Sequence, residues 1–282
     1  MSKLTIGIAT HDDFDGLYFS IQNIRMNHKE VMKDVEFVII DNNPYGVHGE
    51  SIRNYIKWIK EPVQYLPYSN VQSTSVRNNI FDLADTPYVL SMDSHVFVEP
   101  KSIKKLIQFY DDGKDEGNLV QGPLVYDDLT SVSTHFDLTK WAFNMWGQWG
   151  TDDRGLNPKN EAFEIPAQGM GLFSCRRDSW LRFNPHFRGF GGEEGYIHEK
   201  YRKNGKKTLC LPFLRWMHRF ERPNGAHYPN SLEGRFRNYY IGFKELGLDM
   251  TPLMENLKEV ATVEHILKIE KELSTLSDIS KF

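Results

Sequence analysis

Four apolar runs alternate with amphipathic segments over the first hundred residues, and this alternation limits the possible folds more than any other feature. The runs 4–9, 35–40, 63–66 and 88–98 are rich in Ile, Val, Leu and Tyr and predict buried strands. The segments between them carry apolar residues three and four positions apart, which predicts helices: Leu17, Ile21 and Ile24, then Ile52, Tyr55, Ile56 and Ile59, then Val76, Ile80 and Leu83. Such alternation requires right-handed crossovers between parallel strands. The sequence therefore predicts an α/β fold with a mostly parallel sheet flanked by helices.

Polar residues follow or end three of these strands. Thr10 and His11 follow the first strand, Asp41 follows the second, and Asp93 lies in the fourth run. Ligands bind beyond the carboxyl ends of the strands in open parallel sheets, so we expect the functional site at this edge. Asp15 is expected to cap the helix after the first strand.

The fourth run carries a carboxylate and an imidazole two positions apart, at Asp93 and His95. In an extended segment these side chains leave the same face, and together they form part of a coordination shell for a divalent ion such as manganese. The alternative is that Asp93 caps a turn and His95 is a hydrogen-bonded surface residue.

Composition excludes several classes of protein. The net charge of −4 and pI near 6.2 give no general attraction to nucleic acid or anionic membranes. The two cysteines make no disulfide framework, the N-terminus lacks a signal-peptide pattern, and no apolar run reaches the roughly 18 residues of a membrane span. We therefore expect a cytoplasmic protein.

The second half of the chain holds further candidates, each with a structural alternative. Trp146 and Trp149 fit no simple core face and could form an aromatic lip over an acceptor, or an ordinary packing cluster. Gln168 and Gly169 open a glycine-bearing segment that suits close approach of a ligand, or a strand entered through a turn. Tandem glycines ending at Gly192 precede Glu193 and Glu194, which open a helix and could be catalytic or could simply complement its dipole. His218 follows a predicted strand at 209–214 and could be a ligand or a satisfied surface histidine.

In order and context, these motifs resemble the GT-A fold glycosyltransferases of the family-2 type over roughly residues 3–225. The resemblance rests on Thr10, on the strand ending in Asp41, on Val76-Arg77-Asn78 and on Asp93-Ser94-His95. The Asp-Ser-His element is similar to that of the polypeptide N-acetylgalactosaminyltransferases. Gly191-Gly192-Glu193-Glu194 is similar to an element of inverting galactosyltransferases.

The resemblance implies roles for individual residues. Asp41, with Thr10 and His11, would bind the nucleotide, and Arg77 would support the nucleotide and the metal-binding loop. Asp93, His95 and His218 would hold Mn²⁺ or Mg²⁺, with His227 as the alternative third ligand, and Arg219 and Arg222 would neutralise the departing diphosphate. Glu194 would take the place of the general base and Glu193 an acceptor- or sugar-binding place. Trp146, Trp149, Gln168, Gly169 and Gly192 would contact the acceptor.

The resemblance thus implies a metal-dependent glycosyltransferase that uses a nucleotide sugar, most simply a UDP-sugar. The carboxylate pair favours inversion, whereas the Asp-Ser-His element is shared with a retaining family, so both stereochemical outcomes stay open. Its catalytic domain would cover 1–229, with a nucleotide-sugar half at 1–100 and an acceptor half at 101–229. Residues 230–282 would form a helical extension that packs on this domain or joins two copies into a homodimer. A nucleotidyltransferase and a non-catalytic nucleotide-sugar-binding protein are the alternatives. The acceptor could be a glycan, a protein, a lipid-linked sugar or a modified DNA base, because all of them would fit the same donor half. The basic run 200–207 keeps nucleic acid open, with a solvated helix face as the alternative.

Overall fold

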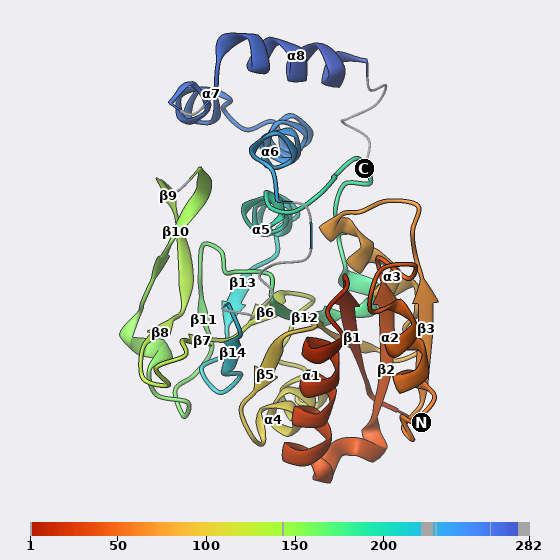
Figure 1. The fold of residues 1–282 in the computed structure, drawn as a ribbon. Helices are drawn as coiled ribbons and strands as arrows, with labels where there is room; N and C mark the ends of the chain where they lie inside the picture. The colour runs from red at the N-terminus through yellow and green to blue at the C-terminus, as the bar shows by residue number, and fades with distance from the viewer. Residues whose placement is uncertain (1, 143, 221–227, 229, 260, 276–282) are drawn as a thin grey trace.

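An eight-stranded mixed sheet forms the centre of the computed structural model, which describes residues 2–142, 144–220, 228, 230–259 and 261–275 (Figure 1). Its strands lie in the order β11 (Phe163–Glu164), β13 (Thr208–Cys210), β6 (Leu119–Gln121), β12 (Leu172–Arg176), β4 (Tyr88–Asp93), β1 (Leu4–Thr10), β2 (Val35–Asp41) and β3 (Val63–Pro67). The four strands from the first 93 residues are mutually parallel, whereas β12 runs antiparallel to β4 and β6. The register pairs Thr10 with Asp41 and Ala9 with Asp93, so these strand ends share one edge of the sheet.

Helices cover both faces of this sheet because alternate residues of the central strands face two separate hydrophobic cores. In β2, for example, Phe37 and Ile39 belong to one core and Val38 and Ile40 to the other. The first core also contains residues of α1 (Phe14–Asn27), α2 (Gly49–Ile56) and α4 (Ser102–Asp111). The second contains residues of α3 (Asn78–Leu83), α5 (Glu193–Lys203), α6 (Leu232–Leu246), α7 (Thr251–Lys258) and α8 (Val263–Ser274). The predicted fold class, a sheet flanked by helices with a helical C-terminal extension, is confirmed.

Two smaller sheets lie beside the large one. A four-stranded sheet has the order β5 (Val96–Val98), β14 (Trp216–His218), β7 (Leu124–Val125) and β8 (Val132–Ser133). A separate hairpin is formed by β9 (His135–Ala142) and β10 (Met145–Gly150).

The run 88–98 is therefore not the single strand that the sequence suggested. It divides into β4, in the large sheet, and β5, in the small one, with a turn at Ser94 and His95 between them. The reason is that β5 pairs antiparallel with β14, which lies more than 100 residues later in the chain. An apolar run does not reveal a change of partner, so periodicity could not locate this break.

The C-terminal helices continue the second core rather than forming a core of their own. Phe236 of α6, Leu253 of α7 and Ile266 of α8 are all buried in it, together with Tyr196 and Ile197 of α5. Among the helices of the described residues, none is long and apolar enough to cross a membrane.

Candidate functional site

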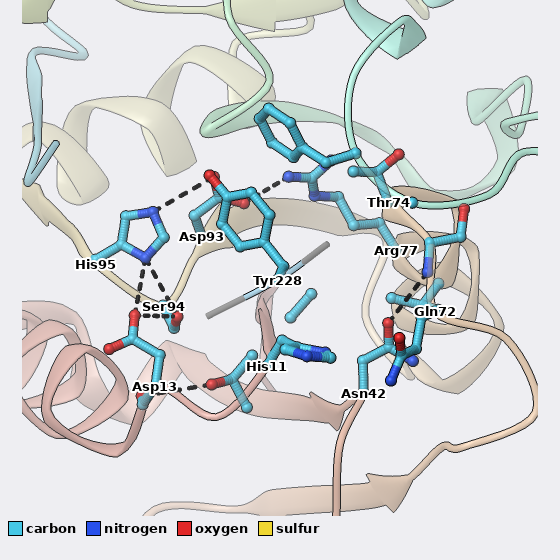
Figure 2. Close-up of a pocket in the computed structure, with 16 residues that line it drawn as sticks. His11, Asp13, Asn42, Gln72, Thr74, Arg77, Asp93, Ser94, His95 and Tyr228 are labelled. Atoms are coloured by element: carbon cyan, nitrogen blue, oxygen red, sulfur yellow. Dashed lines mark hydrogen bonds and ion pairs between the residues drawn. The ribbon is translucent and has the colours of Figure 1, made fainter. Parts of the chain in front are cut away.

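A pocket lies at the carboxyl ends of β1, β2 and β4, where the sequence predicted the site (Figure 2). It holds about 660 Å³, counted out to its open mouth. Phe190 and Tyr228 stack beside it, with ring centroids 4.6 Å apart, and sequence reasoning had identified neither as a site residue. Among the residues that the structure describes, the lining consists of Ala9, Thr10, His11, Asp13, Asn42, Gln72, Ser73, Thr74, Val76, Arg77, Asp93, Ser94, His95, Gly189, Phe190 and Tyr228.

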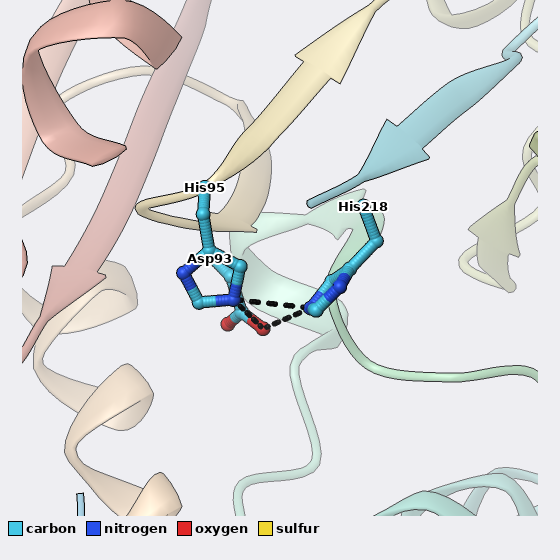
Figure 3. A group of neighbouring side chains, drawn as sticks. All are labelled: Asp93, His95 and His218. Carbon is cyan, nitrogen blue, oxygen red and sulfur yellow. Dashed lines mark hydrogen bonds and ion pairs between the residues drawn. The ribbon is translucent and has the colours of Figure 1, made fainter. Parts of the chain in front are cut away.

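Three predicted metal-binding residues lie together beside this pocket (Figure 3). Asp93 at the end of β4 and His95 in the turn after it meet His218 of β14. Nε2 of His95 lies 3.0 Å from Nε2 of His218, and Oδ2 of Asp93 lies 3.9 and 3.8 Å from these two nitrogens. The turn at His95, rather than an extended segment, brings its ring next to Asp93. All three donor atoms lie within 4.8 Å of one another.

This donor set fits a divalent ion. Two ligands bound at about 2.1 Å and at right angles are separated by about 3.0 Å, close to the spacing of the two imidazole nitrogens. Two imidazoles and one carboxylate also leave coordination positions open for oxygen atoms of a substrate. Asp93, His95 and His218 could therefore hold the metal.

Arg77 holds the carboxylate of Asp93 in place through an ion pair. Its guanidinium is buried between Oδ1 of Asp93, at 2.5 Å, and Oε1 of Glu193, at 3.3 Å. Burial alone would raise the pKa of Asp93, but the Arg77 charge and the neighbouring His218 hold it well below its usual range. Asp93 is thus ionised, as a metal ligand must be.

Asp13 was missed as a site residue by sequence reasoning. The sequence suggested Asp15 as the cap of α1, whereas Oδ1 of Asp13 accepts the backbone N–H of Gly16 at 3.1 Å and caps the helix. Its Oδ2 lies 2.9 Å from Nδ1 of His95. Although burial raises the pKa of Asp13, the hydrogen bond from His95 holds it well below its usual range. The only sequence signal was its place in the polar cluster after the first strand.

The part of the pocket that was expected to bind the nucleotide differs from the expectation in one respect. Thr10 and His11 line it, but Asp41 is not among the described lining residues. Its carboxylate is fully buried and accepts hydrogen bonds from the Tyr65 hydroxyl at 2.8 Å and the Asn43 backbone at 3.1 Å. Its neighbour Asn42 lines the pocket instead.

Asn42 also shapes the pocket by binding the loop between Tyr68 and Ser73. Its amide donates to the carbonyls of Tyr68 and Val71, at 3.0 and 2.6 Å, and accepts the backbone N–H of Ser73 at 3.2 Å. This holds the loop that contributes Gln72, Ser73 and Thr74 to the lining.

Glu193 and Glu194 open α5, directly after Gly192, whose φ of +92° suits glycine. Neither glutamate is among the described lining residues, but Gly189 and Phe190, just before them, are. Burial raises the pKa of both carboxyls, and the neighbouring charge of Glu193 helps to raise that of Glu194 to about 8. Glu193 is engaged by Arg77, whereas Glu194 is 6% exposed at the start of the helix.

The residues predicted to contact the acceptor pack against neighbouring side chains and are not among the described residues that line the pocket. The Trp146 ring covers Gly195 of α5, and Trp149 stacks edge-on against Phe136, with centroids 4.1 Å apart. The Trp149 ring also lies against Gly169, where an added Cβ would be 2.8 Å from it. Gln168 is 0% exposed, and its amide donates to the carbonyl of Ser133 at 3.2 Å. Their contact with an acceptor stays a prediction.

Arg219 lies beside Asp13 and His95. Its guanidinium is 3.9 Å from Oδ1 of Asp13, and its backbone N–H donates a hydrogen bond to the His95 carbonyl. The alternative ligand His227 and the second predicted arginine, Arg222, fall outside the described residues. In the basic run 200–207, Lys200 is buried in an ion pair with Glu245 at 2.8 Å, so the run is not a continuous basic surface.

The sequence of this chain is similar to a known protein family. Residues 5–179, more than half of the chain, match the sequence profile described as glycosyl transferase family 2. No curated protein sequence matches the chain.

Among similar solved structures is a crystal structure of GalNAc-T7 with UDP, GalNAc and Mn²⁺, with a TM-score of 0.67 and 16% identity over 98% of this chain. The alignment covers 58% of that chain, so the present protein spans less than two thirds of it. A structure of S. aureus TarS 1–349 has a TM-score of 0.57 at 10% identity, covering 94% of this chain and 77% of that one. TarS 1–349 in complex with UDP-GlcNAc also has a TM-score of 0.57, at 13% identity, covering 91% and 71%. At these identities the likeness shows the fold.

Proposed function

Because this chain belongs to glycosyl transferase family 2, we propose that it transfers a sugar from a UDP-sugar to an acceptor hydroxyl with the help of Mn²⁺. The observation that carries the proposal is the cluster of Asp93, His95 and His218 beside a pocket at the ends of β1, β2 and β4. Similar structures were obtained with UDP, GalNAc and Mn²⁺, and with UDP-GlcNAc. Both support a nucleotide sugar as the donor.

In the proposed reaction, the bond between the anomeric carbon and the diphosphate breaks while a bond to the acceptor oxygen forms. Asp93, His95 and His218 would hold the ion, which supplies positive charge beside the leaving diphosphate. Arg77 keeps Asp93 ionised and fixed in place. Arg219 adds a cation on the same side.

We assign the proton transfer to Glu194. A general base works best when its pKa lies near the working pH, and the pKa of Glu194 is raised to about 8. Glu193 is less suited because its carboxylate is bound by Arg77. Direct attack by a base-activated hydroxyl inverts the anomeric centre, and NMR of the fresh product would show this.

The test is a donor screen with Mn²⁺, in which release of UDP from UDP-sugars is measured together with product mass for glycan, protein, lipid-linked and modified-DNA acceptors. His218→Ala should abolish the affinity for Mn²⁺ plus UDP measured by titration calorimetry. His186→Ala, at a histidine outside the metal cluster and the pocket lining, is the matched control and should keep it. The proposal fails if the wild-type protein binds no UDP in the presence of Mn²⁺, or if His218→Ala binds both as well as wild type does.

A further inference from the structure

We propose that Asp13 is a positioning residue for the metal centre, which holds His95 in the tautomer whose Nε2 carries no proton and can bind a metal. The inference rests on the proposed metal-dependent function, but it concerns a residue outside the ligand set. It follows from how the two oxygens of this carboxylate are used; Figure 2 shows the contacts of Asp13 with His95 and Ser94.

The first step is the contact between Asp13 and the imidazole. Oδ2 of Asp13 lies 2.9 Å from Nδ1 of His95, and both side chains are more than nine-tenths buried. An ionised carboxylate can only accept a hydrogen bond, so the proton in this contact belongs to Nδ1. Nε2, which faces His218 and Asp93, is then the nitrogen that offers its lone pair to an ion.

The second step is that Asp13 is itself fixed. Its Oδ2 also accepts the hydroxyl of Ser94 at 2.9 Å, and its Oδ1 accepts the backbone N–H of Gly16 at 3.1 Å. Ser94 stands between the two ligands of the Asp-Ser-His turn, so the carboxylate fixes that turn as well as the ring. The rigid start of α1 thereby sets the direction of the His95 ring.

The third step separates this role from helix capping. Asparagine caps helices about as well as aspartate does, so Asp13→Asn keeps the cap, the size and a hydrogen-bond acceptor while removing the charge. Loss of such an outer carboxylate typically weakens metal binding by about 10–100-fold. A purely structural role would leave the affinity of Asp13→Asn for metal unchanged.

The experiment measures binding of Mn²⁺ alone by electron paramagnetic resonance of the free ion, with the full chain. Asp13→Asn should raise the dissociation constant about 10–100-fold with little change in melting temperature. Ser231→Ala, unlike Asp13→Asn, removes a helix cap, that of α6, and should lower the melting temperature without changing Mn²⁺ affinity. Equal Mn²⁺ affinity of Asp13→Asn and wild type would overturn the proposal, as would an equal loss of affinity in Ser231→Ala.

A second measurement does not depend on how any variant folds. In metal-free wild-type protein, ¹⁵N chemical shifts of His95 should show a protonated Nδ1 and an unprotonated Nε2. A proton on Nε2 with a bare Nδ1 would refute the role of Asp13 even if the protein transfers sugars. Conversely, a protein that binds Mn²⁺ through an Nδ1-protonated His95 but transfers no sugar would support the role of Asp13 and count against the proposed function.

Discussion

Glu194, the proposed general base, is a buried carboxyl. Its pKa of about 8, raised from 4.5 by burial and by the charge of Glu193, keeps the carboxyl protonated at neutral pH. A protonated carboxyl cannot accept the acceptor's proton, so turnover at saturating donor should rise with pH up to about 8. Glu194→Gln should lower turnover by about 10²–10⁴-fold and remove this rise. A pH-rate series on both proteins, with Mn²⁺ and UDP binding as the control, tests this; a rise that survives in Glu194→Gln would assign it to another group.

Asn42 provides a second prediction at the residue scale. Its side chain holds the loop that brings Ser73 to the pocket, whereas the Asp41 carboxylate is bound to Tyr65 in the interior. Asn42→Ala should therefore weaken UDP binding more than Asp41→Asn, with little effect of either on turnover at saturating donor. Calorimetric titration of UDP into the two variants decides between them. A stronger effect at Asp41 would restore the role that the sequence suggested for it.

At the level of elements, the β9–β10 hairpin is docked on the helix that carries the two glutamates. Trp146 of β10 lies against Gly195, and an added Cβ there would overlap its indole ring. Gly195→Ala should cost about 1–3 kcal/mol by overpacking and should lower turnover by displacing the start of α5. Combining it with Trp146→Leu, which removes the obstructing ring, should recover part of the stability lost, so a double-mutant cycle in urea measures the contact. Strictly additive effects would show that the two residues do not touch.

The strands and helices also show how much of the fold could be predicted from the sequence. The first four strands and the helices between them were predicted because each buried run and amphipathic face is local. The site edge followed from them, because parallel strands end together. The division of 88–98 into two strands was not predictable, since it depends on pairing with β14 far along the chain. Asp13 was missed for a similar reason: its partner, His95, is 82 residues away, and its capping role looked equally plausible for Asp15.

For the molecule as a whole, a buried ion pair joins the C-terminal helices to α5. Lys200 lies 2.8 Å from Glu245 of α6, which also accepts the hydroxyl of Tyr196 at 2.7 Å. Glu245→Gln leaves the buried charge of Lys200 without a counter-ion and should cost about 3–5 kcal/mol. Because α5 and α6–α8 share one core, calorimetry should show a single transition that shifts as a unit. Two separate transitions would mean that the helices beyond 230 fold independently.

The separation of the proposed metal ligands along the chain affects the order in which the protein acquires its parts during synthesis. Asp93 and His95 leave the ribosome long before His218, which lies 123 residues after His95. The third ligand arrives only when β14 pairs with β5 and β7. The strands β1, β2 and β4, which form one wall of the pocket, are therefore synthesised well before the third proposed ligand of the ion. If the ion is required as proposed, the growing chain can transfer sugar only after β14 has paired with β5 and β7.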